Sequence, residues 1–207
     1  MVSRPENEIP TFWMIAGPNG SGKSSIYSTT EIETFDQSVW IINPDLLAAR
    51  IRVTENLPLY EANIQAVTRI EAWLEASINA HQTVGVETVL STDKYRRLVL
   101  AAKLKKFEFR LIYVTLKSPE LNVERVRLRT QKGGHDVPQA KIHERWGRSL
   151  QQLPWFLQQA DGAAIFDNSG TRLRRIGVKE DGVVTIDPAA PAALLAALGA
   201  APGTSSP

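Results

Sequence analysis

The chain of 207 residues lacks the features that would direct it to a membrane or to an oxidising compartment. It has no cysteine, which excludes disulfide scaffolds, cysteine-ligated zinc and thiol catalysis. No apolar run approaches the roughly 20 residues that cross a bilayer, and residues 1–10 are too polar for a signal peptide. We therefore expect a cytoplasmic protein that has no membrane partner.

Positive charge gathers in the middle of the chain, although the formal net charge is only +2. Residues 93–132 contain 12 Lys/Arg against 4 Asp/Glu, which indicates an anionic partner. The segment has few aromatic residues, and two of them, Phe109 and Tyr113, fall in a predicted core strand, so no platform for stacking bases is evident. We therefore do not expect nucleic acid as the partner, and a nucleic-acid-binding protein is kept as a rival interpretation.

Short apolar runs alternate with helical patterns between residues 11 and 169. Five runs are typical of strands buried on both faces of a parallel sheet: 11–16, 39–43, 83–90, 109–116 and 163–166. Helical patterns cover 59–80, 119–129 and 138–160, the last with a bend or break expected at Pro154. The alternation predicts an open α/β sheet. We expect one domain over 1–187, with its core in 11–169.

The C-terminal part of the chain has a different pattern. Residues 172–178 and 183–186 flank a turn that ends in Asp181-Gly182, which predicts a β-hairpin. Residues 188–207 are mostly Ala, Pro, Gly and Ser. We expect a short frayed helix there and a disordered tail, with no chemistry attached to either.

Residues 17–24 read GPNGSGKS, which fits the P-loop pattern G-x-x-x-x-G-K-[ST] between a predicted strand and a predicted helix. Glycines let backbone N–H groups wrap a phosphate, and the following helix N-terminus points at the same anion. Lys23 would reach the β- and γ-phosphates, and Ser24 would offer its hydroxyl to Mg²⁺. We therefore expect a site for ATP or GTP with Mg²⁺, formed by Gly17, Pro18, Asn19, Gly20, Ser21, Gly22, Lys23, Ser24 and Ser25.

Two acidic residues lie near the ends of predicted strands, where ligands of open α/β sheets bind. Asp45 follows the second strand and could activate an acceptor hydroxyl, or it could cap the helix that begins there. Glu87 ends the apolar part of the third strand, where a buried carboxylate requires a partner. It could contact Mg²⁺ through water, hold a substrate hydroxyl or pair with an arginine. The sequence leaves these alternatives open.

Arginines flank the pair Gly133-Gly134, which separates two predicted helices. Arg125 and Arg129 lie four residues apart on one helix face, and Arg145 lies on the following helix. Helices that carry arginines and are joined by a Gly-Gly hinge are suited to a lid that closes over phosphates. We therefore predict that arginines of this lid contribute to phosphoryl transfer.

Together, these motifs resemble those of the zeta-toxin family of P-loop kinases, especially its shorter members with a Gly-Gly-His-Asp-Val-Pro lid motif. The matching residues are 16–25 (AGPNGSGKSS), 42–45 (INPD), 87–91 (ETVLS), 118–120 (SPE), 125–126 (RV), 133–138 (GGHDVP), Ile142, Arg145, 148–150 (RSL) and 166–169 (FDNS). The ordered set is specific, above all GGHDVP followed by Ile142-x-x-Arg145.

The resemblance implies a nucleotide-kinase-like fold whose parallel sheet has about five strands in the order 2-3-1-4-5. It also implies phosphoryl transfer from ATP or GTP, with Mg²⁺, to the sugar 3′-hydroxyl of UDP-N-acetylglucosamine, by a toxin that an antitoxin protein restrains. Carried over, Asp45 is the acid that activates the acceptor, and Lys23 is the P-loop lysine. Arg129 and Arg145 are the lid arginines, with Arg125 as the competitor of Arg129.

The same comparison suggests the residues that contact the substrate. Glu87, Thr88 and Arg125 are the candidate substrate-binding residues, and residues 167–169 would lie near the nucleotide base. Related sequences often have a second hydroxyl residue after the Glu-Thr pair, and here that position is Val89, so one contact to the acceptor is expected to be missing. The leading hypothesis is a zeta-type toxin that phosphorylates a nucleotide sugar. A non-toxic metabolite kinase with another acceptor is the alternative.

Overall fold

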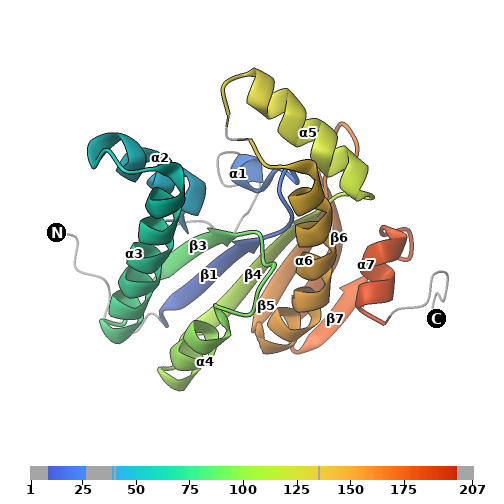
Figure 1. The fold of residues 1–207 in the computed structure, drawn as a ribbon. Coiled ribbons are helices and arrows are strands. Elements are labelled where there is room, and N and C mark those ends of the chain that lie inside the picture. Colours follow the sequence, from blue (N-terminus) through green and yellow to red (C-terminus); the bar gives the residue numbers. More distant parts are fainter. Residues whose placement is uncertain (1–8, 27–38, 40, 135, 200–207) are drawn as a thin grey trace.

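The computed structural model describes residues 9–26, 39, 41–134 and 136–199, which form an α/β fold with one central sheet (Figure 1). In this part of the chain, seven strands pair in the order β2-β3-β1-β4-β5-β6-β7. They are β1 (Thr11–Ala16), β2 (Ile41–Ile42), β3 (Val84–Thr88), β4 (Glu108–Thr115), β5 (Gly162–Asp167), β6 (Arg174–Glu180) and β7 (Val183–Ile186). Strands β1 to β5 are parallel, which confirms the predicted order 2-3-1-4-5.

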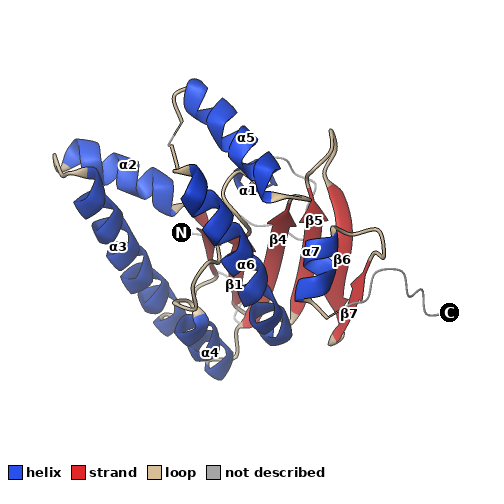
Figure 2. Cartoon of the chain, turned by 45° about the vertical axis from the view of Figure 1, so that its right-hand side comes forward, coloured by secondary structure: helices blue, strands red, loops and turns tan. Residues whose placement is uncertain are grey.

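Four helices cover one face of the sheet (Figures 1 and 2). All helices of the described residues are α1 (Lys23–Ile26), α2 (Pro44–Thr54), α3 (Leu59–Asn79), α4 (Arg96–Leu104), α5 (Pro119–Gln131), α6 (Gln139–Gln159) and α7 (Ala192–Ala197). The four on this face are α3, α4, α6 and α7. Apolar residues of α3, α4, α6 and α7 share a core with Phe12 and Met14 of β1, while Trp13 and Ile15 belong to a cluster on the opposite face. Both faces of β1 are therefore apolar, which explains its continuous apolar run. None of the described helices is both long and apolar enough to cross a membrane.

The predicted C-terminal hairpin is present, and it also extends the sheet. β6 pairs antiparallel with both β5 and β7, an attachment that the sequence did not predict. The turn between β6 and β7 places Asp181 and Gly182 at φ values of 49° and 79°, the left-handed conformation typical of an Asp-Gly turn. Ile176 of β6 is buried in the main core, so apolar packing holds the hairpin on the sheet.

The short helix expected after residue 188 is present as α7, whereas the expected disorder is wrong for residues 188–199, which pack on the main core. α7 inserts Leu194 and Leu195 into the main core, where they are 0% and 3% exposed. Burial of two leucines gives this short helix a tertiary anchor that its Ala- and Pro-rich composition did not reveal. Residues 200–207 lie outside the described residues.

α6 runs through Pro154 without a break, so of the predicted bend or break the break is wrong. Lysines of neighbouring elements satisfy its last carbonyl groups, which have no partner inside the helix. The buried Lys179 of β6 donates to the carbonyl oxygens of Leu157 at 2.9 Å and Gln158 at 2.8 Å. Lys103 of α4 donates to the carbonyl oxygen of Gln159 at 2.8 Å. These positive charges also suit the negative end of the helix dipole.

Replacing Lys179 with Met tests how much this attachment stabilises the fold. The variant keeps an apolar stem of similar length but removes the cationic donor from two carbonyl oxygens. We expect the free energy of unfolding, measured by urea denaturation, to fall by about 2 kcal/mol. Lys141→Met, at an exposed position of α6, is the matched control and should stay within about 0.5 kcal/mol of the parent protein. Equal stability of the two variants would contradict the assignment.

Candidate active site

The P-loop connects β1 to α1 at the carboxyl end of the parallel strands. The N–H group of Gly17 donates to the carbonyl oxygen of Thr88 at 3.2 Å, which joins the start of the loop to the end of β3. The N–H group of Ser21 donates to the carbonyl oxygen of Pro18 at 3.2 Å and closes a turn. Asn19 and Ser21 are buried. The predicted nucleotide-binding residues therefore form one compact loop whose shape the neighbouring strand supports.

Lys23 is buried beneath this loop, with 6% of its surface exposed. Its ammonium group donates to the carbonyl oxygens of Gly17 at 2.7 Å and Pro18 at 3.0 Å. Burial lowers the pKa of Lys23, the carboxylates of Glu87 and Asp45 oppose that shift, and the positive charge of Arg129 adds to it. The charged form is therefore only partly compensated, and a bound anion such as a phosphate would stabilise it.

Glu87 joins the P-loop to the turn before α2. One of its carboxylate oxygens accepts hydrogen bonds from the Ser24 hydroxyl at 3.0 Å and from the side-chain amide of Asn43 at 2.9 Å. The other oxygen lies 4.0 Å from the Lys23 ammonium. The structure thus brings a hydroxyl and a carboxylate together beside the phosphate-binding loop. Oxygen ligands of this kind are the ones that Mg²⁺ prefers.

Asn43, which the sequence analysis did not single out, caps α2. Its side-chain oxygen accepts from the N–H groups of Asp45 at 2.9 Å and Leu46 at 3.2 Å. The alternative that Asp45 itself caps this helix is therefore wrong. Pro44 occupies the first helical turn, and proline at that position could have revealed that the residue before it is the cap. The carboxylate of Asp45 is exposed and available for another contact.

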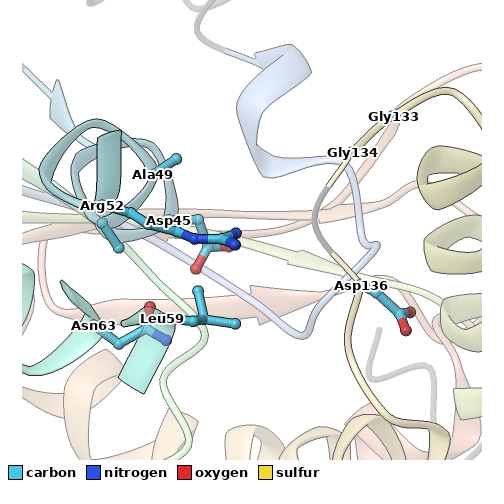
Figure 3. A pocket seen from close by; sticks show the side chains of 9 residues that line it. Asp45, Ala49, Arg52, Leu59, Asn63, Gly133, Gly134 and Asp136 are labelled. Atoms are coloured by element: carbon cyan, nitrogen blue, oxygen red, sulfur yellow. The ribbon is translucent and has the colours of Figure 1, made fainter. Parts of the chain in front are cut away.

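Asp45 lines a cavity of about 440 Å³, hereafter the Asp45 pocket (Figure 3). Residues of α2 and α3 form one wall, and the segment after α5 forms the other. The lining residues are Asp45, Ala48, Ala49, Arg52, Leu59, Asn63, Gly133, Gly134 and Asp136. The predicted hinge glycines therefore border the same cavity as the candidate catalytic acid. His135 lies outside the described residues.

The three predicted arginines occupy different positions around the P-loop. Arg125 donates to the backbone oxygen of Asn168 at 2.5 Å. Arg145 lies 3.5 Å from the side-chain oxygen of Asn19. Arg129 is exposed, and its charge acts on Lys23. A second cavity of about 390 Å³ lies along this helix and is lined by Arg125, Leu128, Arg129, Lys132 and Gly134. Arg125 therefore holds the backbone after β5 while it borders the same cavity as Arg129.

The residues predicted to bind substrate are not among those that line the Asp45 pocket. Glu87 is engaged at the P-loop, and the Thr88 hydroxyl accepts from the N–H group of Leu90 at 3.1 Å. Two polar residues of the pocket, Arg52 and Asn63, were missed by the sequence analysis. Arg52 follows Asp45 by seven residues, and that spacing on one helix places both side chains on the same face. This spacing is the feature of the sequence that could have revealed Arg52 as a neighbour of Asp45.

Solved structures show the same fold at low sequence identity. The AvrRxo1-ORF1:-ORF2 complex with ATP contains a chain that is 16% identical with a TM-score of 0.69, over 97% of this chain and 66% of that one. The PezAT chromosomal toxin–antitoxin system of Streptococcus pneumoniae contains a chain that is 17% identical with a TM-score of 0.56, over 83% of this chain and 75% of that one. This chain thus spans about two thirds of the first structure's length.

Sequence comparison extends the likeness to a relative and to a family. An uncharacterized protein of Haemophilus influenzae is 28% identical over 130 residues, which are 63% of this chain and 88% of that protein. A family model described as "AAA domain" matches residues 12–153. That match covers more than half of the chain and contains the P-loop, Asp45, Glu87 and the three arginines considered for the lid, Arg125, Arg129 and Arg145. The chain therefore belongs to the AAA domain family.

Proposed function

We propose that this protein is a kinase that transfers the γ-phosphoryl group of ATP or GTP to a hydroxyl group of a small molecule in the Asp45 pocket. The position of Asp45 carries this proposal. Its carboxylate lines a pocket that borders the hinge glycines, and its charge acts on Lys23 of the P-loop. The carboxylate that would take the proton of an acceptor hydroxyl is thus close enough for its charge to influence Lys23, the group that would hold the γ-phosphate.

The donor side of the reaction uses the P-loop and its neighbours. Residues 17–25 would hold the phosphates, and the oxygens of Ser24 and Glu87 would hold Mg²⁺. When bound, Mg²⁺ neutralises charge on the phosphates. Lys23 would exchange its contacts with loop carbonyl groups for phosphate oxygens. Arg129 and Arg145 would stabilise the charge that develops on the transferred group.

For the acceptor, we propose a UDP-activated amino sugar, as in the zeta-type toxins that the sequence resembles. The Asp45 pocket has the volume of a small-molecule site, for which 300–1,000 Å³ is the approximate range. The guanidinium of Arg52 matches the geometry of a phosphate, and the amide of Asn63 can donate to and accept from sugar hydroxyls. Another anionic, hydroxylated metabolite would use the same groups. Mass spectrometry of a metabolite extract incubated with protein, ATP and Mg²⁺ would identify which compound gains a phosphate.

Asp45→Asn tests the catalytic assignment. The amide keeps the shape of the side chain but cannot take a proton, so we expect kcat to fall at least roughly 100-fold while the dissociation constant for ATP changes little. Steady-state kinetics and nucleotide titration measure the two quantities. Glu180→Gln, which removes an exposed carboxylate from the distant hairpin, is the matched control. Full activity of the Asp45 variant would remove this residue from its proposed role.

Arg52→Gln tests the acceptor contact. Loss of the guanidinium removes a charge-assisted hydrogen bond, and we expect the KM for the acceptor to rise about tenfold while the dissociation constant for ATP is unchanged. Arg50→Gln alters an exposed arginine of the same helix that does not line the pocket, so its acceptor KM should match the parent protein. Equal KM values for the two variants would argue against recognition by Arg52.

The toxin proposal, with an antitoxin protein as partner, is supported by the fold shared with a PezAT chain. We expect induced expression of the protein to arrest growth of a bacterial host, and expression of Lys23→Ala to leave growth unaffected because the P-loop lysine is lost. Growth curves with both proteins soluble and equally abundant measure this. Normal growth with the parent protein would instead favour a non-toxic metabolite kinase.

A further inference from the structure

Two asparagines from outside the P-loop hold alternate carbonyl groups of the loop. The side-chain amide of Asn122, in α5, donates to the carbonyl oxygen of Asn19 at 2.6 Å. The side-chain amide of Asn168, directly after β5, donates to the carbonyl oxygen of Ser21 at 2.9 Å. The two donors come from different elements, yet they make the same contact two residues apart along the loop.

These contacts determine the direction of two backbone N–H groups. In a planar trans peptide the carbonyl oxygen of one residue and the N–H of the next point in opposite directions. Holding the Asn19 and Ser21 oxygens toward the asparagines therefore turns the N–H groups of Gly20 and Gly22 away from them. Within the described part of the chain, neither of these N–H groups has a hydrogen-bond acceptor. Both are thus available to an anion that the loop surrounds.

The glycines make the close approach of these asparagines possible. A Cβ atom on Gly22 would lie 2.3 Å from the amide nitrogen of Asn168, and one on Gly20 would lie 2.7 Å from the backbone oxygen of Asn122. Both glycines also have positive φ, 76° at Gly20 and 95° at Gly22. The loop glycines therefore admit the supporting side chains as well as the turn itself.

Packing does not explain why Asn122 is an asparagine. The residue is fully buried, and its side-chain oxygen has no hydrogen-bond partner among the described residues. An unpaired buried oxygen costs stability, so an apolar residue would suit a purely structural position better. The contact that distinguishes asparagine here is its donation to the P-loop.

Arg125 connects the two supports. Its guanidinium donates to the backbone oxygen of Asn168 at 2.5 Å, while the N–H of Asn168 donates to the carbonyl oxygen of Thr115 at the end of β4. Arg125 and Asn122 lie on α5 one turn apart, so the same helix supports the loop directly and through Asn168. Arg125 therefore has a partner that does not belong to the Asp45 pocket.

We propose that Asn122 and Asn168 are positioning residues that orient the Gly20 and Gly22 N–H groups toward the nucleotide phosphates. Arg125 is a positioning residue that keeps Asn168 in place, not a substrate-binding residue. This inference rests on nucleotide binding by the P-loop, which is part of the proposed function, but not on the identity of the acceptor.

Asn168→Ala provides the test, because Asn168 is only partly buried and the change introduces no charge. Isothermal titration with inorganic tripolyphosphate, ATP and GTP should give dissociation constants about tenfold higher than those of the parent protein, by a similar factor for all three ligands. Arg125→Gln should act in the same direction with a smaller factor. Arg127→Gln, at an exposed position of the same helix, is the matched control and should bind as the parent protein does.

Tripolyphosphate has no base, so it separates support of the P-loop from recognition of the nucleotide base. Unchanged tripolyphosphate binding by Asn168→Ala, or weakening confined to ATP or to GTP, would overturn the proposal. A large fall in the unfolding temperature without ligand, matched by the loss of binding, would also overturn it, because the role would then be structural. If the parent protein binds all three ligands but phosphorylates no acceptor, the proposed kinase function fails while the positioning role is still decided by the variant.

Discussion

The buried carboxylate of Glu87 holds the candidate site together. A carboxylate placed at the end of a central strand is costly unless hydrogen bonds and an opposite charge compensate it. Here Ser24 and Asn43 donate to one oxygen, and the Lys23 ammonium lies 4.0 Å from the other. The requirement to compensate this one group therefore brings together the P-loop, β3 and the start of α2, three segments that are far apart in the sequence.

In the same arrangement Asn43, and not Asp45, makes the capping contacts of α2. Asn43 uses its amide nitrogen for Glu87 and its amide oxygen for the first N–H groups of α2. Asn43 caps the helix, and Asp45 lines the pocket together with Arg52, Gly133 and Gly134 (Figure 3). Asn43 thus has two roles: it donates to the buried carboxylate of Glu87, and it caps the helix on which the exposed candidate base Asp45 lies.

α5 has two functions in this arrangement. Its first two turns pack against the P-loop through Asn122 and Val126, both buried and both close to Gly20. Its second half carries Arg129 and leads into Gly133-Gly134 beside the Asp45 pocket. α5 thus connects the contacts of the P-loop with one wall of the Asp45 pocket.

Local patterns in the sequence were sufficient for the strands of the parallel sheet, the P-loop, the three longest helices and the Asp-Gly hairpin, because each depends on periodicity or on the conformational preference of a few adjacent residues. Contacts between distant segments decided the rest. The choice of Asn43 over Asp45 as the cap, the engagement of Glu87 with Ser24, the attachment of Arg125 to Asn168 and the packing of α7 all join residues whose partners are set by the sheet order. Sequence alone thus indicated which residues are candidates for the site, whereas only the tertiary structure determined which of the described polar side chains bond to one another and which line a pocket.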